Sequence, residues 1–178
     1  MKQSVKAAVS GVAAALSVAL MFCGSLFYVF TYVVPMVLGV LIIMIKKTFS
    51  GSCAWFVYIA TSIISIFIVP DKETVLMYAL FFGYYPIIKG NIDKIKIKPV
   101  KAIIKFLIFN IAVTVVELIA YFVFGIPFFE DGGFSVAMLV LFVVLMNIVF
   151  ILYDLLLKKY LFLYEKRLEK RVLDIFKH

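Results

Sequence analysis

The residues best suited to chemistry lie on one face of a long apolar stretch. Asn110, Thr114, Glu117 and Tyr121 are spaced four, three and four residues apart, which places their side chains on a single helix face. Glu117 is the only charged residue well inside any apolar run of the chain. This polar stripe could bind a solute through hydrogen bonds, or bind and release a proton.

Composition decides which environment surrounds that stripe. The chain has 178 residues, of which 66% are hydrophobic and 16% charged, with a formal charge of +8 and a mean hydropathy of +1.16. A soluble domain of this size has too little interior to bury so much apolar surface. The sequence therefore predicts an integral membrane protein of one domain and excludes a secreted disulfide scaffold, a disordered chain and a soluble enzyme.

A carboxylate at the depth of Glu117 in a membrane costs at least about 2.5 kcal/mol unless it is paired, hydrated or protonated. No basic residue lies deep in another apolar run to pair with it. We therefore expect Glu117 to face a cavity open to the outside, or to be neutral at pH 7. Asn147, near the middle of the last apolar run, could contribute to the same site. In the alternative interpretation, a protonated Glu117 bonds to Asn147 or a tyrosine and only holds helices together.

The uncharged runs predict six membrane-spanning helices and an all-α fold. A spanning helix needs about 20 mostly apolar residues, and the first run, residues 7–45, is long enough for two, with Cys23-Gly24-Ser25 as the expected break. The fourth run, residues 74–88, is short, so we expect Lys89 to snorkel and complete the crossing; a re-entrant segment is the alternative. The expected spans cover about residues 6–23, 27–45, 51–69, 74–90, 102–125 and 134–156.

Local signals indicate irregular points within these spans. Pro35, with Gly39 after it, predicts a kink in the second span. Pro70 ends the third span and the charged turn after it begins the fourth. Gly83 and Pro86 predict an irregular helix end, and Tyr84-Tyr85 suggests an aromatic belt at the inner interface.

In membrane proteins, Lys and Arg residues are enriched in the short loops on the cytoplasmic side of the membrane. Six spans with both termini cytoplasmic place 17 of the 18 basic residues inside and leave only Lys72 outside, among acidic outer loops. A re-entrant fourth segment would place seven basic tail residues outside. We therefore expect a multi-pass membrane protein, whose positive charge faces anionic inner-leaflet lipid and requires no nucleic acid.

Small residues recur every fourth position in the first span, at Ala7, Gly11, Ala15 and Ala19. Small residues let helix backbones approach closely in lipid. The stripe predicts either packing against another helix of the same chain or a docking face for a separate membrane subunit.

Residues 158–178 form a predicted basic amphipathic helix, with Leu161, Leu168, Val172 and Ile175 on one face. We expect this tail to lie on the inner membrane surface, with contact to a cytoplasmic partner as the alternative. Just before it, Asp154 is expected to pair with Lys158, four residues on.

Several chemistries have no support in the sequence. There is no glycine-rich phosphate loop of the ATPase type, and the only histidine, His178, is terminal. We therefore expect no enzyme activity, no metal site and no cofactor. The outer loop over residues 126–133, with Gly132-Gly133, could be a lid or a plain connector.

These features together resemble the substrate-binding S component of an energy-coupling factor (ECF) transporter. Such proteins are six-helix bacterial membrane proteins of about this length, whose first helix carries an AxxxA motif. Ala15 and Ala19 fit that spacing, and Ala7, Gly11 and Ala15 fit a looser version of it. The resemblance implies docking of this helix on a membrane coupling subunit that works with a pair of ATPases. It also implies a vitamin-like substrate bound in the outer half, where Glu117, Tyr121 and the loops 70–73 and 126–133 fall.

Two other functions remain open from the sequence. The first is a stand-alone solute transporter or proton-coupled carrier, with Glu117 as the proton site. The second is a non-transporting accessory protein whose tail recruits a cytoplasmic partner. No motif in the sequence identifies a substrate.

Overall fold

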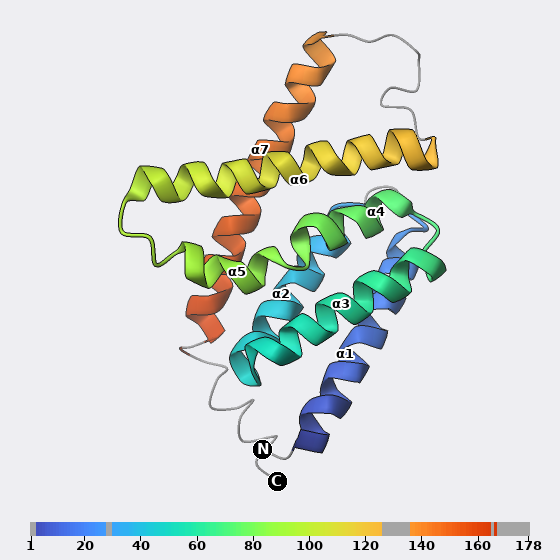
Figure 1. The fold of residues 1–178 in the computed structure, drawn as a ribbon, viewed down its shortest axis with the longest axis vertical. Helices are drawn as coiled ribbons and strands as arrows, with labels where there is room; N and C mark the ends of the chain where they lie inside the picture. Colours follow the sequence, from blue (N-terminus) through green and yellow to red (C-terminus); the bar gives the residue numbers. More distant parts are fainter. Residues whose placement is uncertain (1–2, 28–29, 126–135, 165, 167–178) are drawn as a thin grey trace.

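The computed structural model describes residues 3–27, 30–125, 136–164 and 166. The described chain is helical and contains no strand, so the predicted all-α fold is confirmed (Figure 1). The helices are α1 (Gln3–Gly24), α2 (Val33–Thr48), α3 (Gly51–Ile68), α4 (Lys72–Met77), the π-helix η2 (Tyr78–Phe82), α5 (Tyr85–Ile92), α6 (Lys98–Phe124) and α7 (Val136–Leu163).

Four of the described helices, α1, α3, α6 and α7, are long and apolar enough to cross a membrane. Large apolar side chains remain exposed on them, such as Phe67 on α3 and Phe122 on α6, as lipid-facing surfaces require. The α2 helix is shorter, at about 24 Å for its 16 residues, and the segment from α4 to α5 is interrupted. Six spans with both termini cytoplasmic therefore stay a prediction.

The predicted break in the first apolar run is confirmed, because α1 ends at Gly24. The next helix begins at Val33, later than the expected residue 27. Pro35 therefore lies in the first turn of α2 and does not kink a helix interior, which corrects the expectation from the sequence. Proline suits a first turn because the backbone N–H that it lacks would have no partner within the helix there.

The segment from α3 to α5 follows its local sequence signals. The α3 helix ends at Ile68, and Asp71 caps α4 by accepting hydrogen bonds from the backbone N–H groups of Glu73 and Thr74. The irregular helix end expected at Gly83 and Pro86 is present. The π-helix η2 ends at Phe82, just before Gly83, and α5 begins at Tyr85, with Pro86 in its first turn.

Aromatic side chains fill the core where η2 and α5 meet α6 and α7. The ring of Phe81 lies 4.8 Å from that of Tyr85, 4.9 Å from Phe109 and 5.9 Å from Phe150, measured between centroids. Tyr85 is completely buried, so it does not form the interfacial belt that the Tyr84-Tyr85 pair suggested. Burial of these large rings fixes the position of α5 between the two long helices.

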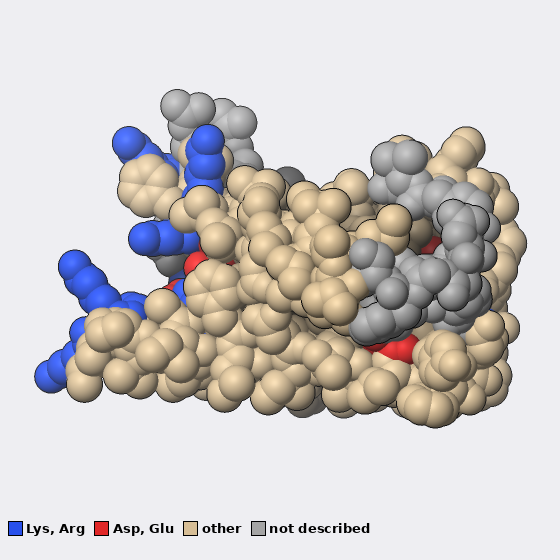
Figure 2. Space-filling model, turned by 90° about the horizontal axis from the view of Figure 1, so that it is seen from above, with Lys and Arg blue, Asp and Glu red and all other residues tan. Residues whose placement is uncertain are grey.

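Polar and basic side chains lie together at one end of the molecule. At one end, the Lys46 ammonium of α2 donates to the carbonyl of Ile87 in α5 over 2.6 Å, and Thr48 lies 2.5 Å from the Tyr164 hydroxyl, just after α7. Lysine side chains project from this end of the molecule, whereas the middle of the surface in view is uncharged (Figure 2). This polarity is what the positive-inside rule requires of a membrane protein with a basic cytoplasmic face.

Most of the predicted tail, and the loop that is expected on the outer side, fall outside the described residues. The α7 helix continues through Leu163 without a break at residue 158. Most of the predicted amphipathic tail, residues 165 and 167–178, lies outside the described part of the chain, as does the predicted lid or connector within 126–135.

Gly39 of α2 lies against the backbone of η2 and the side chain of Tyr153 in α7. A Cβ atom at this position would lie 2.7 Å from the carbonyl oxygen of Phe82 and would also overlap the hydroxyl of Tyr153. We expect Gly39→Ala to lower the free energy of unfolding by about 1–3 kcal/mol, because a backbone carbonyl cannot move aside cheaply. The measurement is the thermal denaturation midpoint of the purified protein in mild detergent.

Gly11→Ala is the matched control for this variant. Nothing lies within 4 Å of a Cβ atom at Gly11, and alanine favours a helix over glycine by about 1 kcal/mol. We therefore expect an unchanged or higher midpoint for Gly11→Ala. If Gly39→Ala also left the midpoint unchanged, the close packing of α2 on η2 would be wrong.

Candidate functional site

Polar groups from the residues just before α2 and from the start of α4 meet at the end opposite the lysine-rich one, where Lys72 also lies. Asp71 accepts hydrogen bonds from the hydroxyls of Thr31, at 3.1 Å, and Thr74, at 2.5 Å. The Thr74 hydroxyl also lies 3.2 Å from the carbonyl oxygen of Thr31. These contacts leave Asp71 structural, because its carboxylate is already used to cap α4 and to tie it to the start of α2.

Glu73, on the same turn, accepts a hydrogen bond from the Tyr32 hydroxyl. The α4 helix, which carries Glu73, packs against α6, which carries Glu117. Two carboxyl groups from different helices thus share this end of the molecule, and one of them belongs to the polar stripe predicted from the sequence.

Glu117 is half-buried and lines a pocket of about 210 Å³ between α6 and α7. Asn110 and Thr114 line the same pocket. The remaining wall is apolar, formed by side chains such as Leu139, Phe142 and Met146. Small-molecule sites commonly combine mostly apolar walls with a few polar groups in this way.

Asn147 is joined to the stripe by a reciprocal amide pair. Asn110 Nδ2 donates to Asn147 Oδ1 over 3.0 Å, and Asn147 Nδ2 donates to Asn110 Oδ1 over 3.1 Å. Each amide also donates to the carbonyl four residues earlier in its own helix. Both amide groups have therefore used both of their N–H donors, and toward a solute they could act only as acceptors.

The other two stripe residues differ in their surroundings. The Thr114 hydroxyl donates to the carbonyl of Asn110 over 2.8 Å. Tyr121 is 53% exposed, packs edge-on against Phe122 and does not line the pocket. The structure thus places Asn110, Thr114 and Glu117 at one pocket, joins Asn147 to them through Asn110, and leaves Tyr121 away from the pocket.

The small-residue stripe of α1 is exposed. Ala7, Gly11, Ala15 and Ala19 all lie on the surface. The face of α1 that is buried, mainly against α3, is a different one, formed by Ser10, Ala13, Ala14, Ser17, Val18 and Met21. Packing within the described chain therefore does not use the stripe.

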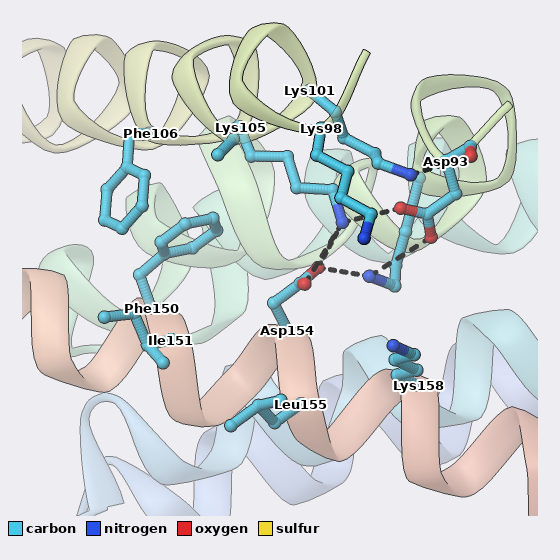
Figure 3. A pocket seen from close by; sticks show the side chains of 12 residues that line it. Asp93, Lys98, Lys101, Lys105, Phe106, Phe150, Ile151, Asp154, Leu155 and Lys158 are labelled. Carbon is cyan, nitrogen blue, oxygen red and sulfur yellow. Dashed lines mark hydrogen bonds and ion pairs between the residues drawn. The ribbon is translucent and has the colours of Figure 1, made fainter. Parts of the chain in front are cut away.

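A cluster of charged side chains lies at the basic end, between α5, α6 and α7 (Figure 3). Asp154 of α7 accepts hydrogen bonds from Lys89 and from the Tyr85 hydroxyl, the latter at 2.6 Å. Lys105 Nζ lies 3.1 Å from both Asp154 oxygens and 2.7 Å from Asp93 Oδ1. Lys89 Nζ also lies 3.4 Å from Asp93 Oδ2. Two lysines and two aspartates therefore form one network, which we call the charge cluster.

The burial of the two lysines makes the charge cluster energetically important. Lys89 is 1% exposed and Lys105 is 8% exposed. A buried ammonium group is strongly unfavourable unless it is paired and hydrogen-bonded. Asp154 meets this requirement for both lysines at once, and therefore links α5, α6 and α7.

The sequence analysis did not identify this cluster. Asp154 pairs with Lys89 and Lys105 in the described structure, and not with Lys158 as expected. Lys89 is buried, so it does not snorkel to the interface as expected. One signal was present: Tyr85, Lys89 and Asp93 are spaced by four residues, which places them on one face of a short helix.

We expect Asp154→Asn to destabilise the protein by about 3 kcal/mol or more, because it leaves two buried lysines with one aspartate. Adding Lys89→Met should recover much of this loss, since Lys105 would keep its 2.7 Å contact with Asp93. The thermal denaturation midpoints of the single and double variants in detergent test this. Equal destabilisation by the two variants would contradict the shared network.

Comparison of the chain with protein-family models, curated proteins and solved structures finds no match. The function of the chain must therefore be inferred from its own residues.

Proposed function

We propose that the chain is the substrate-capture subunit of an ATP-driven uptake transporter in a bacterial inner membrane. Its substrate would be a vitamin-like small molecule, and its energy would come from a separate membrane coupling subunit with two ATPases. The observation that carries this proposal is the exposed small-residue stripe of α1.

The stripe differs from an ordinary lipid-facing surface on the same helix. Beside it, Val12, Leu16 and Leu20 are large, apolar and exposed, as expected for contact with acyl chains. Ala7, Gly11, Ala15 and Ala19 instead form a shallow track that another helix could approach closely. The buried face of α1, which packs on α3, adjoins this track, and Ala15 and Ala19 border a groove whose other wall is Ile64 and Ile68 of α3. The described residues leave the track itself uncovered, so that a helix of another subunit could dock there.

The pocket beside Glu117 supports solute capture. On the predicted topology it opens toward the outside, where a solute would arrive. The pocket combines the carboxyl group of Glu117 with the amide of Asn110, which has only acceptor capacity left. This combination favours a substrate that donates hydrogen bonds or carries positive charge.

The need for other subunits follows from what the sequence lacks. The chain contains no glycine-rich phosphate loop, so it cannot hydrolyse ATP by that route. Concentrative uptake would therefore require ATPases on other chains, reached through the α1 surface.

We expect Gly11→Leu to abolish co-purification of the coupling subunit and the ATPases. The side chain would project from the track and keep the partner helix at a distance. The experiment extracts the tagged protein from its native host in mild detergent and identifies bound subunits and small molecules by mass spectrometry. Small-molecule retention should survive in the variant, because the Glu117 pocket lies between other helices.

Leu16→Trp is the control. Leu16 is 51% exposed on α1 and lies five positions after Gly11, on a different face of the helix, so tryptophan there adds bulk outside the track and should leave the complex intact. Loss of the complex in both variants would indicate general damage to α1. A wild-type protein that purifies alone and without a solute would contradict the proposal.

The half-buried Glu117 favours one other function, a proton-coupled carrier in which this carboxyl group binds and releases the proton. Such a carrier would move solute in liposomes that contain this chain alone. A substrate-capture subunit would bind the solute and show no uptake without its partners.

A further inference from the structure

The pocket at the basic end has more positive charge than its own aspartates can neutralise. It has a volume of about 490 Å³ and lies between α5, α6 and α7. Lys89 and Lys105 are balanced by Asp93 and Asp154 within the charge cluster. Three further lysines, Lys98, Lys101 and Lys158, line the same pocket. We call these three the rim lysines.

The rim lysines have no carboxylate partner among the described residues. Lys101 donates to the backbone carbonyl of Asp93 over 3.2 Å, which leaves its charge uncompensated. Lys98 and Lys158 form no ion pair with the part of the chain that the structure describes, and Figure 3 draws both beside the charge cluster without an interaction. The pocket therefore has an excess of three positive charges and suits an anion.

The charge cluster pre-positions the surfaces that carry these lysines. Lys98 and Lys101 belong to the first turn of α6 and Lys158 to the last turns of α7. Lys105 and Asp154, which join those two helices through a pair of 3.1 Å contacts, lie between them. An anion therefore binds at helices that are already held together and has to order only the lysine side chains, which lowers the entropic cost of binding.

The remaining wall of the pocket indicates an amphiphile. Phe106 and Phe150 line it, together with Ile151 and Leu155 of α7. Ile151 is 44% exposed and Leu155 is 55% exposed, so this wall continues onto the apolar surface of α7. A molecule with a phosphate at the lysines and a hydrocarbon chain along α7 would satisfy both parts of the pocket.

We propose that this pocket binds the phosphate group of an anionic phospholipid of the inner leaflet. The phosphate is held by the rim lysines, and an acyl chain follows Ile151 and Leu155. The site is separate from the Glu117 pocket, and its binding chemistry does not depend on the transport function proposed above.

The test uses the full-length protein in detergent, stripped of lipid and titrated with phosphatidylglycerol. Native mass spectrometry counts the bound lipid, and phosphatidylcholine serves as the neutral-lipid comparison. The rim variant is Lys98→Gln with Lys101→Gln and Lys158→Gln. The control variant is Lys94→Gln with Lys96→Gln and Lys159→Gln, which removes three exposed lysines that do not line the pocket.

We expect the rim variant to bind phosphatidylglycerol at least about tenfold more weakly than the control, since each lysine lost removes a charge-assisted contact to phosphate. Wild-type protein and control should each prefer phosphatidylglycerol to phosphatidylcholine. Both variants should keep the thermal midpoint of the wild type, because the charge cluster is intact in each.

Two results would overturn the proposal. Equal weakening in both variants would show that lipid responds only to the overall charge of this end. Displacement of phosphatidylglycerol by millimolar inorganic phosphate at constant ionic strength would show that the occupant is a soluble phosphate compound and that the apolar wall contributes nothing.

Discussion

The neutralisation of two buried lysines by Asp154 is the constraint on which this structure depends. The apolar packing between membrane helices is non-directional, and lipid competes for the same surfaces. A carboxylate that must meet Lys89 of α5 and Lys105 of α6 allows few arrangements, because leaving either ammonium unpaired is far more costly than losing an apolar contact. The same carboxylate accepts the hydroxyl of Tyr85, whose ring stacks in the aromatic core. The charge cluster therefore sets the register of α5, α6 and α7 together.

The two ends of the molecule differ in charge. Lysines surround the charge cluster at the basic end, and the carboxyl groups of Asp71, Glu73 and Glu117 lie toward the other, acidic end. The acidic end has the pocket suited to a solute that donates hydrogen bonds, and the basic end has the pocket suited to phosphate. The uncovered track on α1 runs between the two ends, so that a partner docked there would lie beside both.

The sequence was sufficient wherever the signal is local. Hydropathy located the long helices, Cys23-Gly24-Ser25 located the end of the first one, and Asp71 began the next element as a capping residue should. The sequence was insufficient where contacts between distant residues decide the structure. Pro35 indicated a kink only because the start of α2 was placed too early. Tyr85 was assigned to an aromatic belt because a tyrosine near a membrane end gives the same pattern whether it is buried or interfacial.

The choice of partner for Asp154 shows the limit most clearly. A lysine four residues away in the same helix is always a possible partner, and the sequence offers Lys158. Lys89 and Lys105 are distant in sequence and are buried, so their need for a counter-charge is stronger than that of an exposed lysine. For the predicted binding residues, helical spacing correctly grouped Asn110, Thr114 and Glu117 at one pocket. Helical spacing could not show that Tyr121 does not line this pocket, or that the amides of Asn110 and Asn147 donate N–H groups to each other.

The orientation of these two ends in the membrane tests the account most directly. The free cysteines Cys23 and Cys53 are first replaced by serine. Two separate variants of that protein then carry one cysteine each, introduced by Lys72→Cys at the acidic end or by Lys96→Cys between α5 and α6. The measurement is labelling by a membrane-impermeant maleimide in intact cells. The account predicts that Lys72→Cys is labelled in intact cells and Lys96→Cys only after permeabilisation. Labelling of Lys96→Cys in intact cells, with Lys72→Cys protected, would contradict it.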